Sequence, residues 1–302
     1  MTLDIMMPFY GRIDHLKLAV ESVLHQSEPD WRLVVVDDVY PDLAAGRWVQ
    51  AIADPRVTYV RNTENLRPSR NYRKCVGLAD TEFVTIMGCD DVMLPGYVAR
   101  VRELIAAHPE ATVIQPGVEV IDGEGTVYQP LADRVKRWYA PRGSGVRTLT
   151  GETMARSLIR GNWTYFPSLC WRTDVLRRSP FRLDLDVVQD LAMLIEIAED
   201  GGTLLVDDRI VFRYRRHAAS VSAVTGPDGS KFAQERVLFR EAAAAFRERG
   251  WKRAARSADL HLSSRLNAAT ELPHARTAAG RRSLARHVFG RSADGHSPTQ
   301  AG

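Results

Sequence analysis

The first 120 residues alternate short apolar runs, rich in β-branched residues, with segments of helical period. This alternation is typical of a parallel sheet built from successive strand–helix units. Between the first two runs, Leu16, Val20 and Val23 share one helical face. The predicted strands are Leu3–Met7, Leu33–Val36, Val57–Val60, Phe83–Met87 and Thr112–Gln115. The sequence therefore predicts a doubly wound α/β domain.

The middle of the chain is less regular. Residues 121–180 contain several glycines and aromatics but only short apolar runs, which predicts loops and short strands laid over the sheet. A helix is predicted over Val187–Ala198. Two separate strands are predicted after it, over Thr203–Val206 and Ile210–Tyr214.

The C-terminal part differs in both pattern and charge. Residues 251–302 hold nine Lys or Arg against three Asp or Glu, whereas the first 250 residues carry 32 basic and 34 acidic side chains. From Ser230 to about Phe289 the apolar residues follow a helical period. Two interpretations fit these basic helices: an amphipathic surface lying on anionic lipid, or a helical cap packed on the rest of the chain. Residues 292–302 are small and polar and are predicted to be disordered.

Several classes of protein are excluded. No run approaches the roughly 20 apolar residues of a membrane-spanning helix, and Met1–Asp4 lack the start of a signal peptide. Cys75, Cys89 and Cys170 are too few and too widely spaced for a disulfide framework or a zinc site. We therefore expect reduced thiols and a location in the cytoplasm, either free or peripheral at the inner face of the membrane.

Two adjacent carboxylates, Asp90 and Asp91, follow the predicted strand Phe83–Met87 directly. Ligands of open parallel sheets bind beyond the carboxyl ends of the strands. Paired carboxylates favour a hard divalent cation, Mg²⁺ or Mn²⁺, and such a cation in turn suits a diphosphate. The alternative is that Asp91 caps a helix beginning near Pro95 and that Asp90 is a solvated loop residue.

A second acidic pair, Asp37 and Asp38, ends the strand Leu33–Val36. Two such pairs at one edge of a sheet predict a cleft of strong negative potential, suited to a cation or to base N–H and ribose hydroxyl donors. Neither G-x-G-x-x-G nor G-x-x-x-x-G-K-[ST] occurs, which argues against a dinucleotide fold or a P-loop. Phosphate charge would then be met by the metal and by Arg67 and Arg70.

Seven short motifs, in order and with similar spacing, resemble those of the family 2 glycosyltransferases over about residues 3–222. They are Met7-Pro8-Phe9-Tyr10, Ser22-Val23-Leu24-x-Gln26, Val34-Val35-Val36-Asp37-Asp38, Asn65 with Ser69-Arg70-Asn71, Met87-Gly88-Cys89-Asp90-Asp91, Val188-Gln189-Asp190-Leu191, and Tyr214-Arg215-Arg216-His217-x-x-Ser220. The resemblance implies an inverting enzyme of the hexosyltransferase type with a GT-A fold. The nucleotide-sugar half would be residues 1–120 and the acceptor half 121–222, followed by a basic helical extension, 223–291, and the tail, 292–302.

The resemblance also implies roles for the matching residues in donor binding. Pro8 and Tyr10 would lie against the nucleotide base, and Asp38 would accept a hydrogen bond from a base N–H. Arg70 would face the base or the diphosphate. Asp90 would hold the ribose or a metal-bound water.

For the reaction itself, the resemblance implies that Asp91 and His217 bind Mn²⁺ or Mg²⁺ and that Asp190 is the catalytic base. Inverting transfer independently requires one carboxylate to accept the proton of the acceptor hydroxyl. Gly88 stands where many family members have Asp, which puts the metal requirement in question. Gln189 stands where Glu is common, and we assign it to acceptor positioning because an amide can hydrogen-bond but cannot carry charge.

The segment containing Asn162 and Trp163 lies where the family forms its acceptor pocket. An aromatic face suits a sugar ring, so acceptor binding is one interpretation; packing in the core is the other. Asp38 fits the N3–H of uracil or thymine, which favours UDP or dTDP sugars. The expected acceptor is a polysaccharide, a cell-envelope glycolipid or a small molecule, and no nucleic acid partner is expected.

Two other functions compete with glycosyl transfer. A sugar nucleotidyltransferase would carry a Gly-rich loop after its first strand, where this chain has Pro8-Phe9-Tyr10-Gly11-Arg12. A non-catalytic protein that only binds nucleotide sugars is suggested by Gly88. Retention of Asp91 and Asp190 argues against that second alternative.

Overall fold

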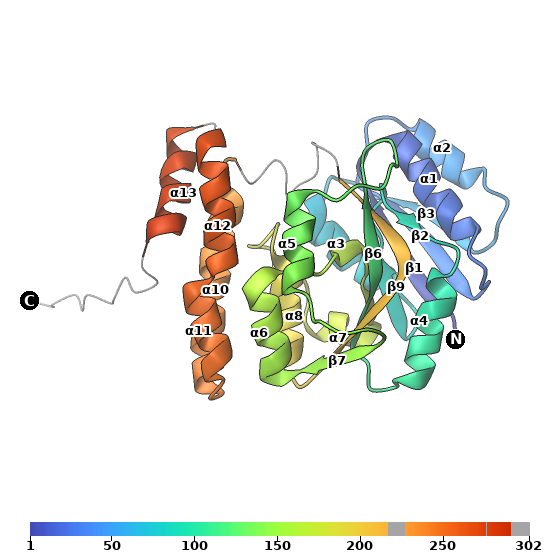
Figure 1. Cartoon of the computed structure of the whole chain (residues 1–302). Coiled ribbons are helices and arrows are strands. Elements are labelled where there is room, and N and C mark those ends of the chain that lie inside the picture. Colours follow the sequence, from blue (N-terminus) through green and yellow to red (C-terminus); the bar gives the residue numbers. More distant parts are fainter. Residues whose placement is uncertain (217–226, 276, 291–302) are drawn as a thin grey trace, which may run out of the picture. The chain divides into compact units, whose positions relative to one another are not determined.

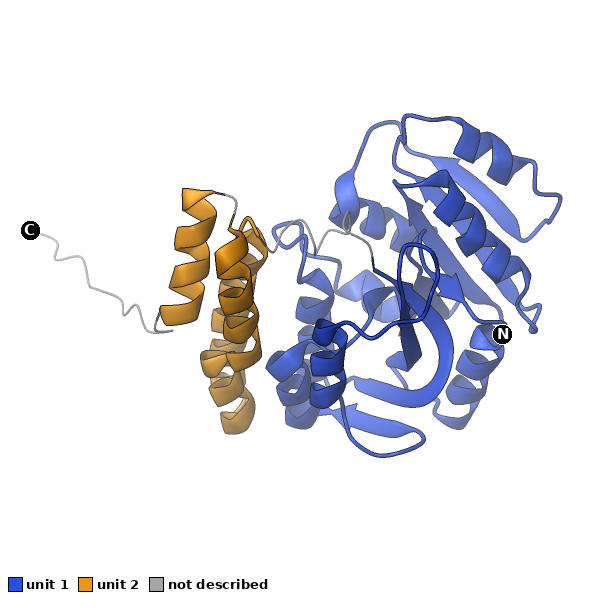
Figure 2. Ribbon diagram, turned by 45° about the horizontal axis from the view of Figure 1, so that its top comes forward, with its two compact units in different colours: residues 1–218 blue, residues 219–302 orange. Residues whose placement is uncertain are grey.

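The predicted alternation of strands and helices is present in the computed structural model, which describes residues 1–216, 227–275 and 277–290. The chain divides into unit 1, Met1–Ala218, and unit 2, Ala219–Gly302 (Figure 2). Unit 1 contains the sheet, and unit 2 is helical in its described part. The predicted fold class, α/β with a mostly parallel sheet and C-terminal helices, is confirmed.

Four parallel strands form one half of the sheet (Figure 1). They are, from the edge inward, β3 (Val57–Arg61), β2 (Trp31–Asp37), β1 (Leu3–Phe9) and β4 (Phe83–Ile86). Met6 pairs with Val34 of β2 on one side and with Ile86 of β4 on the other. Because of this register, β2 and β4 end at the same edge of the sheet, on either side of β1.

The other half of the sheet is mixed. Its strands are β8 (Cys170–Arg172), β6 (Val113–Ile121), β9 (Thr203–Arg215), β5 (Val92–Met93) and β7 (Arg147–Thr150). β8 is antiparallel to both β4 and β6, whereas β9 runs parallel to β6. β5 follows Asp91 and pairs with β9, so the end of β9 lies beside the Asp90–Asp91 turn.

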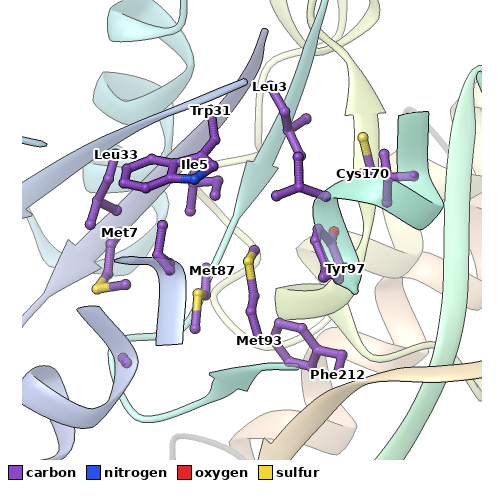
Figure 3. Packing of buried hydrophobic residues seen from close by; sticks show 14 of the residues in the cluster. Leu3, Ile5, Met7, Trp31, Leu33, Met87, Met93, Tyr97, Cys170 and Phe212 are labelled. Carbon is purple, nitrogen blue, oxygen red and sulfur yellow. The ribbon is translucent and has the colours of Figure 1, made fainter. Parts of the chain in front are cut away.

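Helices cover both faces of this sheet (Figure 1). On one face lie α1 (Ile13–Leu24), α2 (Ala44–Gln50) and α4 (Tyr97–Ala107). Alternate residues of β1, among them Leu3, Ile5 and Met7, pack there in the main hydrophobic core (Figure 3). Three further helices of unit 1 are α3 (Arg67–Leu78), α7 (Thr173–Arg178) and α8 (Gln189–Glu199). α3 contacts β1, β4 and α7.

The prediction of loops and short strands over residues 121–180 is correct for β7 and β8 but misses the helices. This segment contains three helices, α5 (Leu131–Tyr139), α6 (Gly151–Gly161) and α7, and a 3₁₀ turn, η1 (Phe166–Ser168). α6 buries Met154 and Leu158 on one face, but glycines at both of its ends obscure that pattern. α5 buries a single residue, the acidic Asp133, so it has no apolar face of the usual kind.

The two strands predicted after residue 203 are one strand, β9. Its register against β6 shifts around Gly117, where Val206 and Ile210 face Gln115 and Gly117. A Cβ on Gly117 would lie 2.6 Å from the backbone of Arg209, so only glycine permits this bulge. The bulge interrupts the apolar alternation, which explains the wrong prediction.

Unit 2 contains four helices in its described part. They are α10 (Ser230–Glu248), α11 (Lys252–Leu260), α12 (Leu262–Glu271) and α13 (Ala278–Phe289), with a 3₁₀ turn, η2 (Leu272–His274). Phe232, Ala268 and Leu284 form a small core. No described helix of the chain is long and apolar enough to cross a membrane. The tail predicted to be disordered, residues 292–302, lies outside the described residues.

Candidate active site

Asp90 and Asp91 lie in the turn that follows β4. Asp91 is buried: its Oδ1 accepts the backbone N–H of Arg215 at 2.7 Å, while its Oδ2 has no hydrogen-bond partner among the described residues. Burial, and then the charge of Asp90, raise the pKa of Asp91 well above its usual range. The alternative role of Asp91 as a helix cap is not seen, since α4 begins after Gly96 without a side-chain cap. A cation or a hydrogen-bond donor would stabilise this carboxylate.

Arg215 fixes the turn in place. Its Nε donates to the carbonyl of Asp90 at 2.6 Å, and its Nη1 donates to the carbonyls of Asp122 and Gly123 at 3.0 and 3.1 Å. The side chain therefore connects the acidic turn to the end of β6. The sequence motif contained Arg215, but its role as a support for the two carboxylates was not predicted.

Gly88 leaves room for both carboxylates, which approach the position that a Cβ would occupy. A Cβ on Gly88 would collide with Asp91 Oδ2 and would lie 3.0 Å from Asp90 Oδ1. Within the described residues, no group of three or more His, Cys, Asp or Glu side chains could hold a metal ion. His217, predicted to bind the metal together with Asp91, lies outside the described residues. Mg²⁺ is commonly bound by one or two carboxylates together with substrate phosphates. Asp90 and Asp91 therefore fit a hard divalent cation of this kind.

The carboxylate of Asp37 accepts hydrogen bonds from three groups of the fold. It is buried, forms an ion pair with Arg61 at 2.6 Å and accepts the backbone N–H of Tyr40 at 2.7 Å. It also accepts the hydroxyl of Tyr59. Asp37 thus supports the edge of the sheet instead of facing a ligand.

Asp38 organises the loop before α3. Its Oδ1 accepts from Asn62 Nδ2 at 2.6 Å and from the backbone N–H of Leu66 at 2.7 Å, and its Oδ2 accepts from the backbone N–H of Arg67 at 2.9 Å. Arg67 has a φ of 63°, which is costly for a residue other than glycine and needs such support. A carboxylate offers about four acceptor positions. One position on Oδ2 is left for a ligand.

The other predicted nucleotide-binding residues lie on elements next to this loop. Pro8 pairs with Val36 across β1 and β2. Tyr10, directly after β1, is 56% exposed, and its ring meets that of Tyr40 at 5.6 Å. Arg70 lies in the first turn of α3, and its exposed guanidinium makes no hydrogen bond or ion pair with the described residues.

Gln189 and Asp190 form the first turn of α8. Gln189 is 6% exposed; its Nε2 donates to the carbonyl of Asp186 at 3.3 Å, and its buried Oε1 has no partner within the described part of the chain. Ser69 of α3 donates to Asp186 Oδ1 at 2.9 Å. The segment that carries Asp190 is therefore tied to the helix that carries Arg70.

Tyr72 of α3, the helix that carries Arg70, is a residue that the sequence analysis did not single out. Its ring packs against Phe166 at 5.2 Å and Phe181 at 5.5 Å. Burial raises the pKa of Tyr72, and the charges of Asp90 and Asp190 add to the rise. The available signal was its position directly after Ser69-Arg70-Asn71.

The two predicted acceptor residues have structural roles. Trp163 is 3% exposed, and its Nε1 donates to Ser157 Oγ of α6 at 3.2 Å, which favours packing over sugar binding. Asn162 ends α6 in the left-handed conformation, with a φ of 32°. Asn is one of the residues that tolerate this conformation at a helix end.

Asp133 connects α5 to the end of β9. It is buried, pairs with both Nε and Nη2 of Arg216 at 2.5 and 2.9 Å, and accepts the hydroxyl of Tyr165 at 2.8 Å. The ring of Tyr165 packs on that of Tyr214 at 5.3 Å. The sequence analysis missed this network because it expected no helix at α5.

Known proteins resemble both the sequence and the fold. The family model for glycosyl transferase family 2 matches residues 4–171. The putative colanic acid biosynthesis glycosyl transferase WcaA of Escherichia coli is 29% identical over 34% of this chain and 39% of its own length. The succinoglycan biosynthesis protein ExoO of Rhizobium meliloti is 26% identical over 71% of this chain and 61% of its own length. The chain thus spans less than two thirds of either relative.

Solved structures share the fold. The complex of S. aureus TarS 1-349 with UDP-GlcNAc superposes with a TM-score of 0.66 at 14% identity, over 95% of this chain and 89% of that one. The complex with UDP gives a TM-score of 0.64 at 16% identity, over 87% and 72% of the two chains. At this identity the likeness concerns the fold.

Proposed function

The chain belongs to glycosyl transferase family 2, and on that premise we propose that it is an inverting enzyme that moves a sugar from a nucleoside diphosphate sugar to an acceptor hydroxyl. One observation carries the proposal. At the carboxyl edge of the sheet, Asp91 keeps a buried oxygen without a partner beside a second carboxylate, Asp90. Such an arrangement is costly unless a ligand completes it.

Residues 1–120 would bind the donor. The exposed ring of Tyr10 offers a stacking surface for a base, and Asp38 has one acceptor position left for a base N–H. Arg70 and Arg67 would meet the diphosphate, since both are exposed. UDP is the first nucleotide to test and dTDP the second, because the N3–H suits Asp38 and the fold neighbour TarS is solved with UDP.

Asp90 and Asp91 would hold Mn²⁺ or Mg²⁺, which neutralises the charge of the leaving diphosphate when bound. Arg215 keeps both carboxylates in position through the bonds described above. The protein therefore supplies the anionic cradle, and the substrate supplies the remaining oxygens.

Residues 121–222 would bind the acceptor, with Asp190 as the base. As the acceptor oxygen bonds to the anomeric carbon, the bond from that carbon to the diphosphate oxygen breaks, and the hydroxyl proton passes to Asp190. The unpartnered Oε1 of Gln189 could accept a hydrogen bond from the acceptor. Because the named relatives act in the biosynthesis of colanic acid and succinoglycan, we propose a polysaccharide or a cell-envelope glycoconjugate as the product.

A thermal-shift panel of UDP, dTDP and GDP, each with and without Mn²⁺, tests donor binding. A ligand at 100 times its dissociation constant adds ~2.7 kcal/mol to stability, so UDP or dTDP with Mn²⁺ should raise the Tm clearly. A panel in which no nucleotide raises the Tm would contradict the proposal.

Asp190→Asn tests the chemistry separately. We expect the nucleotide-induced Tm shift to persist while turnover of the donor falls by ~10²–10⁴-fold, the usual contribution of a positioned base. Wild-type turnover in this variant would overturn the assignment of Asp190. A wild-type protein that binds nucleotide sugars but neither transfers nor hydrolyses them would instead be a non-catalytic binding protein.

A further inference from the structure

Helix α5 turns its apolar side chains outward. Leu131, Val135 and Trp138 are 70%, 40% and 70% exposed, and their i, i+4, i+7 spacing places them on one face of the helix. Val127 and Tyr128, just before the helix, are exposed as well. Single exposed apolar residues are common on protein surfaces, but a contiguous group of this size marks an interaction site.

The same surface is positively charged. Arg134 and Arg137 flank the apolar face and are exposed, and Arg142 follows the helix. The one acidic residue of α5, Asp133, is buried on the opposite side and paired with Arg216. The outer surface of α5 therefore combines large apolar side chains with exposed arginines, and the helix itself presents no acidic side chain there.

The inner side of α5 is fixed, so the apolar face cannot turn inward. The ion pair of Asp133 with Arg216 and the hydroxyl of Tyr165 hold one point of the helix. Lys136 Nζ holds a second point by donating to the carbonyl of Thr164 at 2.8 Å. The exposed surface is thus a preformed feature of unit 1.

We propose that this face, Leu131, Val135 and Trp138 with Arg134 and Arg137, docks on an anionic lipid bilayer. Helices that lie in a membrane interface bury Trp and Leu at the boundary of the acyl chains while arginines meet the lipid headgroups. Trp in particular favours that boundary. The charge complementarity selects an anionic surface. This docking surface is independent of glycosyl transfer and distinct from the basic helices of unit 2.

The test is cosedimentation of the full chain with vesicles of phosphatidylcholine alone and of phosphatidylcholine with phosphatidylglycerol. We expect binding to the anionic vesicles alone, weakened by salt. The double variant Leu131→Ser with Trp138→Ser should reduce binding by at least about tenfold, because it removes the two apolar side chains that the bilayer would bury. Arg134→Gln with Arg137→Gln should reduce binding on the order of tenfold as well.

Two matched controls use exposed leucines elsewhere. Leu18→Ser with Leu43→Ser in unit 1 should bind like the wild type, since these residues lie on α1 and before α2. Leu262→Ser with Leu266→Ser changes exposed leucines of the basic helices of unit 2 and should also bind vesicles like the wild type. Equal binding by the wild type and the α5 variant would overturn the proposal, as would absence of binding to anionic vesicles. Self-association that the α5 variant abolishes, without vesicle binding, would assign this face to a protein contact instead.

Fluorescence gives a readout specific to α5. Trp138 is exposed, whereas the other five tryptophans are buried or half-buried: Trp31, Trp48, Trp163, Trp171 and Trp251. Vesicles with brominated acyl chains should quench Trp138, and Trp138→Leu should remove the quenching while vesicle binding persists. Binding without quenching in the wild type would show that another surface meets the lipid and would overturn the proposal.

Discussion

Two strands of unit 1, β2 and β4, are each followed by an Asp-Asp dipeptide at the same edge of the sheet, yet Asp37 and Asp91 have different environments. The carboxylates of Asp37 and Asp38 together receive donors from six groups of the protein, including the guanidinium of Arg61. Asp91 receives one N–H, and its second oxygen has no partner among the described residues. The difference teaches that unsatisfied hydrogen-bonding capacity, not residue type, marks the position for a ligand.

Unit 2 provides a buried polar cluster whose members hydrogen-bond mainly to one another. Ser264 donates to Glu235 and lies 2.6 Å from His287 Nε2. Because the serine proton is already directed to Glu235, Nε2 must carry the imidazole proton, which agrees with a buried Nδ1 that has no partner within the described residues. Such a closed cluster affects stability and offers a ligand little.

The largest expected effect is that of Asp91→Asn. Loss of the carboxylate should lower metal-dependent turnover by about 10³-fold, or ~4 kcal/mol of transition-state stabilisation. The same change should raise the free energy of unfolding of the ligand-free protein by about 1 kcal/mol, because it removes a buried charge beside Asp90. Steady-state kinetics and urea unfolding measure the two effects. Asp207→Asn is the matched control: Asp207 is buried but paired with Arg100, so its loss should lower stability and leave turnover intact.

Asp37→Asn should have the opposite effect: a loss of stability with little change in nucleotide binding. It weakens the hydrogen bonds that the buried Asp37 carboxylate accepts from Arg61, Tyr59 and Tyr40, so the free energy of unfolding should fall by about 2 kcal/mol. The affinity for the nucleotide should remain close to that of the wild type. Asp42→Asn, at an exposed loop position, serves as a control that should change stability by less than ~0.5 kcal/mol. A stable Asp37→Asn protein that has lost nucleotide binding would invalidate the contrast between the two pairs.

The last expected effect, no larger than the previous one, concerns pH and unit 2. Burial, and then the nearby His261, lower the pKa of His287 to about 3. In the unfolded chain His287 is protonated as the pH falls below about 6.5, whereas in the folded chain it stays neutral to a lower pH. Protonation therefore favours the unfolded chain, and the free energy of unfolding falls as the pH drops below 6.5. At pH 5 the loss should be about 2 kcal/mol.

Hydrogen exchange of α12 and α13 between pH 7 and pH 5 measures this loss. His287→Gln keeps a donor for Ser264 but does not titrate, so its exchange should show a smaller dependence on pH. The comparison of the two proteins cancels the opposite contribution of Glu235, whose pKa burial raises. Equal pH dependence in both proteins would show that His287 is not responsible.

Local sequence patterns were enough to predict the helices and strands that bury apolar residues on one face. The strands β1 to β4 and helices α1 and α4 were predictable for this reason. α5 was not, because it turns Leu131 and Trp138 outward and buries Asp133, the inverse of the pattern by which helices are recognised. Trp163 was ambiguous because sugar platforms and core residues are chemically alike, and its burial depends on the packing of α6.

The sequence by itself determined that two acidic pairs follow strands of one parallel sheet, because local apolar runs mark those strands and the motifs place the pairs directly after them. Only the tertiary structure decided that Asp37 is held by three protein donors while Asp91 keeps one oxygen without a partner among the described residues. The guanidinium that satisfies Asp37 comes from 24 residues away, and the Arg215 backbone that fixes Asp91 comes from 124 residues away. Hydrogen bonding at such distances along the chain depends on which groups the fold brings to the strand ends, and no local pattern records that.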